Sequence, residues 1–210
     1  LYETRKNDKL PISGRDVLLI SQIAFYDDPG RFTQMTNKLC DELEQRIADG
    51  VSVFPEGTKR IMLTGTPMAI PNWKIHNIVE TSGGAVVCEE MCTGTRYFEK
   101  QVDESGQTVD EEIQALANRY IRACTCPVFS ENSQRIDRVL HMVKKYHIQG
   151  VIYHVLRGCL VYDYEYPLLE RALEREGIPV IRVESDYNEE DIEQLRIRIE
   201  AFIELIKLKH

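Results

Sequence analysis

The stretch Arg60-Ile-Met-Leu-Thr-Gly65-Thr-Pro67 decides how this chain is expected to fold. It is a short apolar run that ends at a glycine, as a buried strand does where it turns toward a helix. Three similar runs follow at 85–89, 150–156 and 180–184, and helical patterns separate them. Strands that alternate with helices predict an α/β fold, with a mostly parallel four-stranded sheet and helices on both faces.

Helical patterns fill the stretches between the strands and close the chain. Their apolar residues recur every three or four positions, as on one face of a helix. The predicted helices of this part cover 72–81, 108–122, 133–146, 166–176 and 189–208.

The first 55 residues differ from the rest because their pattern is helical throughout. One helix is predicted over 15–27 with a cap near Ser13. A second is predicted over 31–49, where the apolar period continues until Gly50 ends it.

We therefore divide the chain into a helical connector at 1–55 and a lobe at 56–210. The chain starts at Leu1 rather than at a methionine, so we expect it to be cut from something longer. The connector is then expected to pack on an absent N-terminal part.

Composition narrows the class of protein. The chain has 210 residues, 43% of them apolar, which is enough for one domain with a core. The net charge of −8 argues against a general affinity for nucleic acid or anionic membranes, and no apolar run approaches the ~20 residues of a membrane span.

Neither a dinucleotide-binding fingerprint nor a Walker A loop occurs, which disfavours an NAD enzyme or an intrinsic ATPase. Six cysteines are too few for a disulfide scaffold, so a cytoplasmic location is predicted.

Four of the six cysteines lie at the ends of predicted strands or before a helix. Cys92 follows the strand at 85–89, Cys159 follows the next strand, and Cys124 and Cys126 form a Cys-x-Cys pair. The carboxyl ends of the strands in an open α/β sheet line one crevice, so these thiols are expected to meet there. Neighbouring thiolates favour a soft metal centre, and iron–sulfur clusters are held by cysteine thiolates.

Simpler interpretations apply to several of these positions. A lone cysteine is usually a small buried hydrophobe, which is our interpretation of Cys40 and Cys88. His154 lies within a strand, where a histidine is more often a core residue than a ligand. Gly65 fits either a plain turn or a loop where a ligand approaches the backbone.

Residues 89–96, Glu-Glu-Met-Cys-Thr-Gly-Thr-Arg, form the motif with the most chemistry. They combine two carboxylates, a thiol, a hydroxyl, a glycine and a cation directly after a strand. A charged surface turn is the alternative interpretation, but such a turn seldom needs a cysteine and a glycine together at a strand exit.

The order of the motifs resembles one known family. The motifs are Leu63-Thr-Gly-Thr-Pro67, Glu89-Glu-Met-Cys-Thr-Gly-Thr95, Ala123-Cys-Thr-Cys-Pro127, Gln149-Gly-Val-Ile-Tyr153, Arg157-Gly-Cys159 and Val183-Glu-Ser-Asp-Tyr187. Together they resemble the 2-hydroxyacyl-CoA dehydratase D-component and benzoyl-CoA reductase family. Within it, the chain looks most similar to the anaerobic reductases that contain a double-cubane cluster.

The resemblance implies a fold, a cofactor and partners. Subunits of the family have two Rossmann-like (flavodoxin-like) lobes with an iron–sulfur cluster, [4Fe–4S] or an [8Fe–9S] double cubane, in the cleft between them. A separate ATP-hydrolysing iron–sulfur activator protein delivers a low-potential electron. Members dehydrate 2-hydroxyacyl-CoA, reduce aromatic acyl-CoA or, in the double-cubane group, reduce small molecules.

The resemblance also assigns residues. Four cysteines match the family's metal-ligand positions, although which member of the Cys-x-Cys pair binds iron stays open; they are Cys92, Cys124, Cys126 and Cys159. Six further residues are predicted to serve the reaction or the cofactor. These are Glu89, Glu90 and Arg96 as catalytic groups for protons or hydrogen bonds, and Thr93, Gly94 and Gly65 as cofactor-binding positions.

The chain departs from the family pattern because it looks like the connector and C-terminal lobe only. Without the missing N-terminal lobe and its cysteines, we expect no stable cluster and no activity from this piece alone. We expect the intact protein to be an activator-driven reductase that works as a homodimer or a heterodimer. A dehydratase subunit that binds acyl-CoA and a non-catalytic assembly lobe are the two alternatives.

Overall fold

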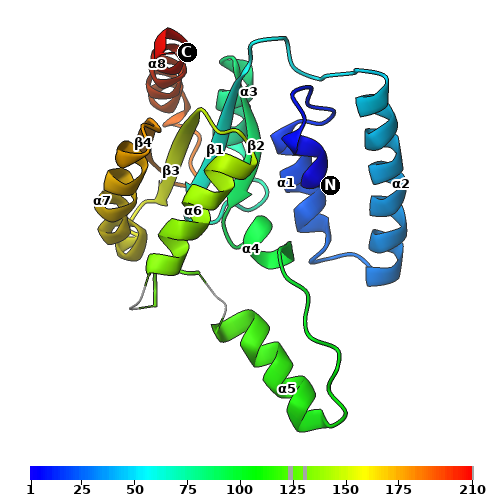
Figure 1. The fold of residues 1–210 in the computed structure, drawn as a ribbon. Helices are drawn as coiled ribbons and strands as arrows, with labels where there is room; N and C mark the ends of the chain where they lie inside the picture. Colours follow the sequence, from blue (N-terminus) through cyan, green and yellow to red (C-terminus); the bar gives the residue numbers. More distant parts are fainter. Residues whose placement is uncertain (123–124, 130–131, 210) are drawn as a thin grey trace.

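The computed structural model describes residues 1–122, 125–129 and 132–209, and it contains an α/β fold around one parallel sheet (Figure 1). The strand order is β2-β1-β3-β4, and every neighbouring pair is parallel. The predicted fold class is therefore confirmed. The strands are β1 (Lys59–Gly65), β2 (Gly84–Glu90), β3 (Gly150–Leu156) and β4 (Val180–Ser185).

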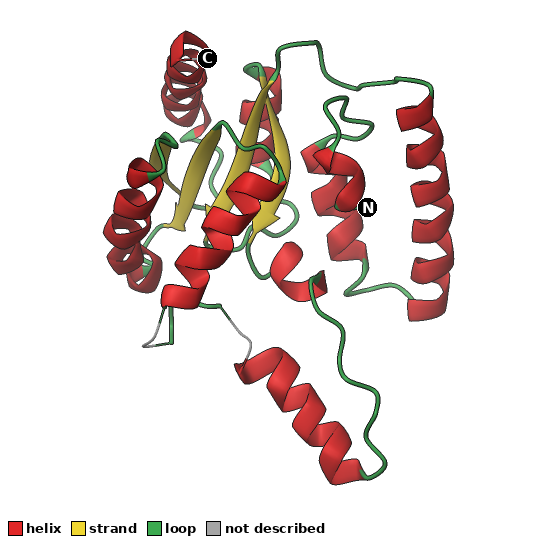
Figure 2. Ribbon diagram, in the orientation of Figure 1, coloured by secondary structure: helices red, strands yellow, loops and turns green. Residues whose placement is uncertain are grey.

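Helices cover both faces of this sheet (Figure 2). Side chains alternate between the faces of a strand, so each strand contributes to two cores. In β1, Met62 faces the core made with α6 (Ser133–Lys145) and α7 (Leu160–Arg175). Its neighbour Ile61 faces the core made with α3 (Lys74–Thr81) and α8 (Ile192–Lys209). Burial on both faces explains why the strands are apolar runs rather than alternating patterns.

The N-terminal residues are helical, as predicted. They form η1 (Glu3–Lys6), α1 (Gly14–Ile23) and α2 (Pro29–Ala48). Ser13 caps α1, because its hydroxyl accepts a hydrogen bond from the backbone N–H of Asp16. These elements have a small core of their own and also contact β2 through Arg5, which is fully buried. The division at residue 55 stays a prediction.

Several segments differ from the sequence prediction, and α1 ends at Ile23 rather than at residue 27. The helix expected at 166–176 begins earlier, since α7 starts at Leu160 and contains Pro167 in its interior. Proline is typical of the first turn of a helix, but Pro167 lies in the interior of this one. The short helix α4 (Thr95–Phe98) was not predicted.

The stretch predicted as a helix over 108–122 consists of α5 (Val109–Ala117) and a π-helical turn, η2 (Asn118–Arg122). Figure 1 shows α5 as an arm that extends away from the sheet and its covering helices. Among the described residues, no helix combines the length and the apolar character needed to cross a membrane.

Gly65 ends β1 in a conformation that favours glycine, with φ at +113°. A Cβ at this position would collide with the carbonyl oxygen of His154 on the neighbouring strand. The strand exit therefore needs a glycine for packing inside the sheet.

We expect Gly65→Ala to lower the free energy of unfolding by about 2–5 kcal/mol, from backbone strain and overpacking together. The matched control is Gly57→Ala, at φ +83° with open space around the added methyl, which should cost only the strain of about 1–2 kcal/mol. Urea denaturation of both variants measures the difference. Equal losses would show that the close approach to His154 does not matter.

Candidate functional site

The candidate cysteines that the structure describes lie near residues at the carboxyl edge of the sheet. Cys92 lies two residues beyond β2, and Cys159 is the N-cap residue of α7, just beyond β3. Both strands flank β1 in parallel, so their carboxyl ends meet at the same edge. Thr125, next to Cys126, lies 3.5 Å from a carboxylate oxygen of Glu90 at the end of β2. Cys92 is exposed and the other two are half-buried, whereas the predicted ligand Cys124 lies outside the described residues.

Arg96 is hydrogen-bonded to three residues at this edge of the sheet. It lies in α4, one helical turn after Cys92, and its Nη1 donates to the Cys92 sulfur at 3.2 Å. The same nitrogen lies 3.3 Å from the Tyr162 hydroxyl in α7. The rest of the guanidinium donates to both carboxylate oxygens of Glu90 at 3.0–3.1 Å. Arg96 therefore joins the end of β2 to the helix that follows β3.

Glu90 is fully buried and is surrounded by arginines. Besides Arg96, it pairs with Arg135 and with Arg138, both in α6, and it accepts a hydrogen bond from the Thr64 hydroxyl at 3.1 Å. Burial alone would raise the pKa of this carboxyl, but the charges of Arg135 and Arg96 outweigh burial and hold the pKa below its usual value. Glu90 is therefore a fixed negative charge.

Arg135 extends the network toward α7. Its Nε donates to Glu165 at 2.6 Å, and the other oxygen of Glu165 accepts from the Tyr153 hydroxyl, also at 2.6 Å. Sequence reasoning missed Arg135, since nothing in the pattern of its helix marks an arginine as buried. Its position in the first turn, on the side of the apolar residues of α6, was the only available signal.

Glu89 points away from Glu90, as neighbouring residues of a strand do. It pairs with Arg5 at 3.2 Å, lies 3.3 Å from His76 in α3, and accepts from the Tyr2 hydroxyl at 3.1 Å. Burial raises its pKa, but the charge of Arg5 and the hydrogen bond with His76 outweigh burial and lower it. A general acid or base works best with a pKa near the working pH, so this geometry suits anchoring better than proton transfer for both glutamates.

The predicted cofactor-binding positions have partners inside the protein. The hydroxyl of Thr93 donates to the carbonyl of Met68 at 2.8 Å. A Cβ at Gly94 would lie 2.7 Å from the carbonyl oxygen of Glu89, so packing requires a small residue there, as at Gly65. A cofactor role for these three residues stays a prediction.

A small pocket of about 140 Å³ opens beside Cys92. Its walls combine cationic and aromatic side chains, namely Arg96, Lys100, Arg119, Arg138, Tyr97 and Tyr120, with Glu99 as the acidic member. In the described part of the chain, no three histidine, cysteine or acidic residues lie close enough together to hold a metal ion.

His154 is fully buried in β3, and both ring nitrogens have partners. Nδ1 lies 3.0 Å from the Thr66 carbonyl, to which it donates, and Nε2 accepts from the Ser185 hydroxyl at 2.8 Å. Burial lowers the pKa of His154 to about 4. The geometry is that of a neutral core histidine, which agrees with its interpretation from the sequence.

This pKa makes the stability of the fold depend on pH. An unfolded histidine titrates near 6.5, so the unfolded state takes up this proton first as the pH falls. Compared with the variant His154→Asn, the unsubstituted chain should lose about 3 kcal/mol of unfolding free energy as the pH falls from 6.5 to 4. Below pH 4, His154 should cause no further loss. Denaturation of both proteins across this range tests the claim, with His141→Asn, at an exposed site, as control. Parallel curves for the native chain and His154→Asn would contradict it.

A sequence model of the family described as 2-hydroxyglutaryl-CoA dehydratase, D-component, matches residues 1–206. The chain belongs to this family.

Three curated relatives support the assignment. They are the "Putative dehydratase subunit YjiM" of Escherichia coli (33% identical), the (R)-phenyllactyl-CoA dehydratase beta subunit of Clostridium sporogenes (24%) and the (R)-2-hydroxyglutaryl-CoA dehydratase subunit beta of Acidaminococcus fermentans (25%). The matches cover 93%, 89% and 94% of this chain but only 50%, 47% and 50% of the relatives. The chain thus spans about half the length of the curated relatives it matches. All three are named as dehydratase subunits, which favours the dehydratase alternative over the double-cubane reductase that the sequence first suggested.

In this chain, Glu90→Gln should be strongly destabilising. The amide cannot balance Arg96 and Arg135, which would be left as buried charges, at a cost of about 3–5 kcal/mol. The matched control is Glu99→Gln, because Glu99 pairs with Arg138 at a partly exposed site and should cost less than about 1 kcal/mol. Chemical denaturation at pH 7 compares the two. Similar small losses for both would mean that Glu90 does not organise the edge.

Proposed function

We propose that this chain is part of a dehydratase subunit that removes water from a 2-hydroxyacyl-CoA thioester, with its edge cysteines as ligands of an iron–sulfur cluster. One structural observation carries the proposal: the buried Glu90 carboxylate holds Arg96 against the Cys92 sulfur, at the sheet edge that also carries Cys159. The family and the names of its relatives supply the reaction class.

The donor set fits one side of a cluster site. Sulfur donors suit iron–sulfur clusters, and [4Fe–4S] clusters take four cysteine thiolates. Cys92, Cys159 and one member of the Cys124-x-Cys126 pair would serve here. Since these residues do not form a closed metal site by themselves in the described ranges, we expect further ligands from the rest of the subunit.

The residues around the cysteines would prepare them for this role. The Arg96 guanidinium donates to the Cys92 sulfur at 3.2 Å, and this hydrogen bond fixes where that sulfur points. Glu90 and Tyr162 hold the guanidinium in place from the two sides. When bound, a cluster supplies electron transfer at a potential that burial and hydrogen bonds to sulfur adjust.

The energy for the reaction would come from a partner protein. The sequence has no phosphate-binding loop of the Walker type, so we propose that a separate ATP-hydrolysing activator delivers the electron. We also propose that this subunit works in a dimer, either with a second copy of itself or with a different subunit.

A reductase with a double-cubane cluster is the second candidate, and the Cys124-x-Cys126 pair favours it because it adds a thiolate to this lobe. The iron content separates the two candidates, since a double cubane holds eight irons and a [4Fe–4S] cluster holds four. A protein without iron after anaerobic preparation would instead point to a non-catalytic assembly lobe.

The test is anaerobic purification of the whole subunit that contains this chain. Iron and sulfide are counted, and turnover of a 2-hydroxyacyl-CoA to the enoyl-CoA is measured with ATP, activator and a low-potential donor. We expect about four irons per cluster and dehydration. The 210-residue chain alone, handled in air, should carry no iron, because exposed thiolates oxidise.

Cysteine variants test the ligands. Cys92→Ser and Cys159→Ser should lower the iron content and abolish dehydration while the lobe stays folded, at a cost of about 1–2 kcal/mol. The matched control is Cys40→Ser, on α2 and away from the edge, which should keep both iron and activity. Full iron and native rates in Cys92→Ser and Cys159→Ser would show that these cysteines are packing residues.

A further inference from the structure

Helix α5 presents its apolar side to solvent. Val109, Ile113, Leu116 and Tyr120 are 68%, 58%, 48% and 47% exposed, and none of the residues of α5 is buried. A surface helix normally turns its apolar stripe toward the core of its own chain. The arm formed by α5 and η2, residues 109–122, does the opposite.

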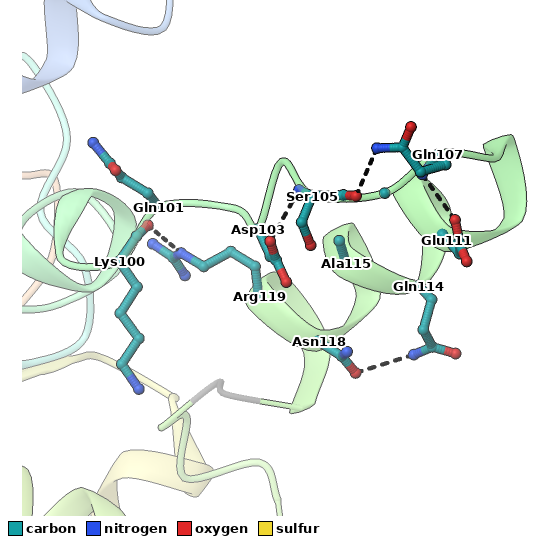
Figure 3. Close-up of a pocket in the computed structure, with 11 residues that line it drawn as sticks. Lys100, Gln101, Asp103, Ser105, Gln107, Glu111, Gln114, Ala115, Asn118 and Arg119 are labelled. Carbon is teal, nitrogen blue, oxygen red and sulfur yellow. Dashed lines mark hydrogen bonds between the residues drawn. The ribbon is translucent and has the colours of Figure 1, made fainter.

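The polar side of the arm faces the chain itself. The loop at 100–107 and α5 enclose a polar pocket of about 520 Å³, to which the helix contributes Glu111, Gln114 and Asn118 (Figure 3). These residues repeat at helical spacing on the side opposite the apolar stripe. The arm is therefore fixed by polar contacts, and its apolar stripe has no cover among the described residues.

The stripe has the spacing of a helix-pairing seam. Its four residues are separated by four, three and four positions, which is the alternation of a coiled-coil heptad. Apolar side chains at these positions fit between the corresponding side chains of a second helix.

The charges beside the stripe indicate how the second helix would run. The arm is acidic at its start, with Asp110, Glu111 and Glu112, and basic at its end, with Arg119 and Arg122. Arg119 also holds the arm, because its Nη2 donates to the carbonyl of Tyr97 at 2.7 Å, but its positive charge stays at the basic end. An antiparallel copy brings the acidic start of each arm beside the basic end of the other. A parallel copy would bring like charges together.

We propose that the arms of two copies of this chain pair antiparallel through this stripe, about a two-fold axis near Gln114 and Ala115. Such an interface is self-complementary, as two-fold symmetry requires. The inference goes beyond the proposed function, because it depends on neither the cysteines nor a substrate.

The paired arms would lie next to the candidate site. Tyr120 at the end of the stripe lies 6.4 Å from Tyr97, ring centre to ring centre, and the Tyr97 ring lies 4.6 Å from that of Phe25 in a tilted contact. Tyr97 and Tyr120 also line the pocket beside Cys92. A paired arm thus continues an exposed aromatic surface next to the cysteine edge. A pair of helices this short buries less than the ~1,200 Å² of a standard interface, so the dimer should be reversible.

Sedimentation of the chain over a range of concentrations tests the proposal. We expect a concentration-dependent monomer–dimer equilibrium. The double variant Ile113→Lys, Leu116→Lys should raise the dissociation constant at least about tenfold, because charges replace the central apolar contacts. The matched control is Gln114→Lys, which adds a lysine on the polar side of the same helix and should pair like the native chain. Circular dichroism checks that all variants keep their helices.

Cross-linking tests the orientation. Chains carrying Ile113→Cys are mixed with chains carrying Leu116→Cys, and disulfides are mapped by mass spectrometry after mild oxidation. Antiparallel pairing predicts bridges between positions 113 and 116. Bridges between two copies of position 113 would overturn the orientation.

Two results would overturn the pairing itself. One is a chain that stays monomeric at the highest concentration reached, or a dimer that the double lysine variant does not weaken. The other is a whole subunit that is monomeric and yet protects α5 from hydrogen exchange, because the rest of the subunit would then cover the stripe.

Discussion

The Glu90 carboxylate lies in the interior of the fold, where an unbalanced charge would cost several kcal/mol. The chain balances it with arginines from two separate helices, Arg96 from α4 and Arg135 from α6. Satisfying this charge therefore determines where both helices stand relative to β2. Because Arg96 also reaches the Cys92 sulfur and the Tyr162 hydroxyl, the position of the candidate metal ligand follows from the same balance.

The adjacent residue performs a similar task on the other side of β2. Glu89 holds Arg5 and lies beside His76, so it ties the N-terminal residues to the sheet. Two consecutive buried carboxylates thus anchor opposite sides of one strand. This arrangement attaches the helical residues before the first strand to the sheet, although their own core is small. It also gives both glutamates an electrostatic role at the site, because their negative charges hold arginine side chains in place.

Unlike the residues at the sheet edge, the arm is held in place mainly by local contacts. Its helix has a capping box between Thr108 and Glu111, and Arg119 donates to the backbone carbonyl of Tyr97 at 2.7 Å. A nine-residue helix without buried residues is marginal alone, since most helical stability in proteins comes from packing. Local capping and a few polar contacts hold it in place, while its apolar side stays available for another protein surface. The edge and the arm are joined by exposed aromatic rings, so assembly and chemistry would meet at one end of the molecule.

The sequence by itself determined the four strands, because burial on both faces makes each an apolar run that ends at a turn. It also placed Cys92 and Cys159 at one edge, because parallel strands must end on the same side of their sheet. It misplaced the start of α7, in which Pro167 lies in mid-helix although proline is typical of a first turn. Only the tertiary structure decided that Glu90 is an anchor held by Arg135, 45 residues away, and that the apolar side of α5 faces outward. Both depend on which residues distant in sequence come together, and a local pattern of residue types carries no information about that.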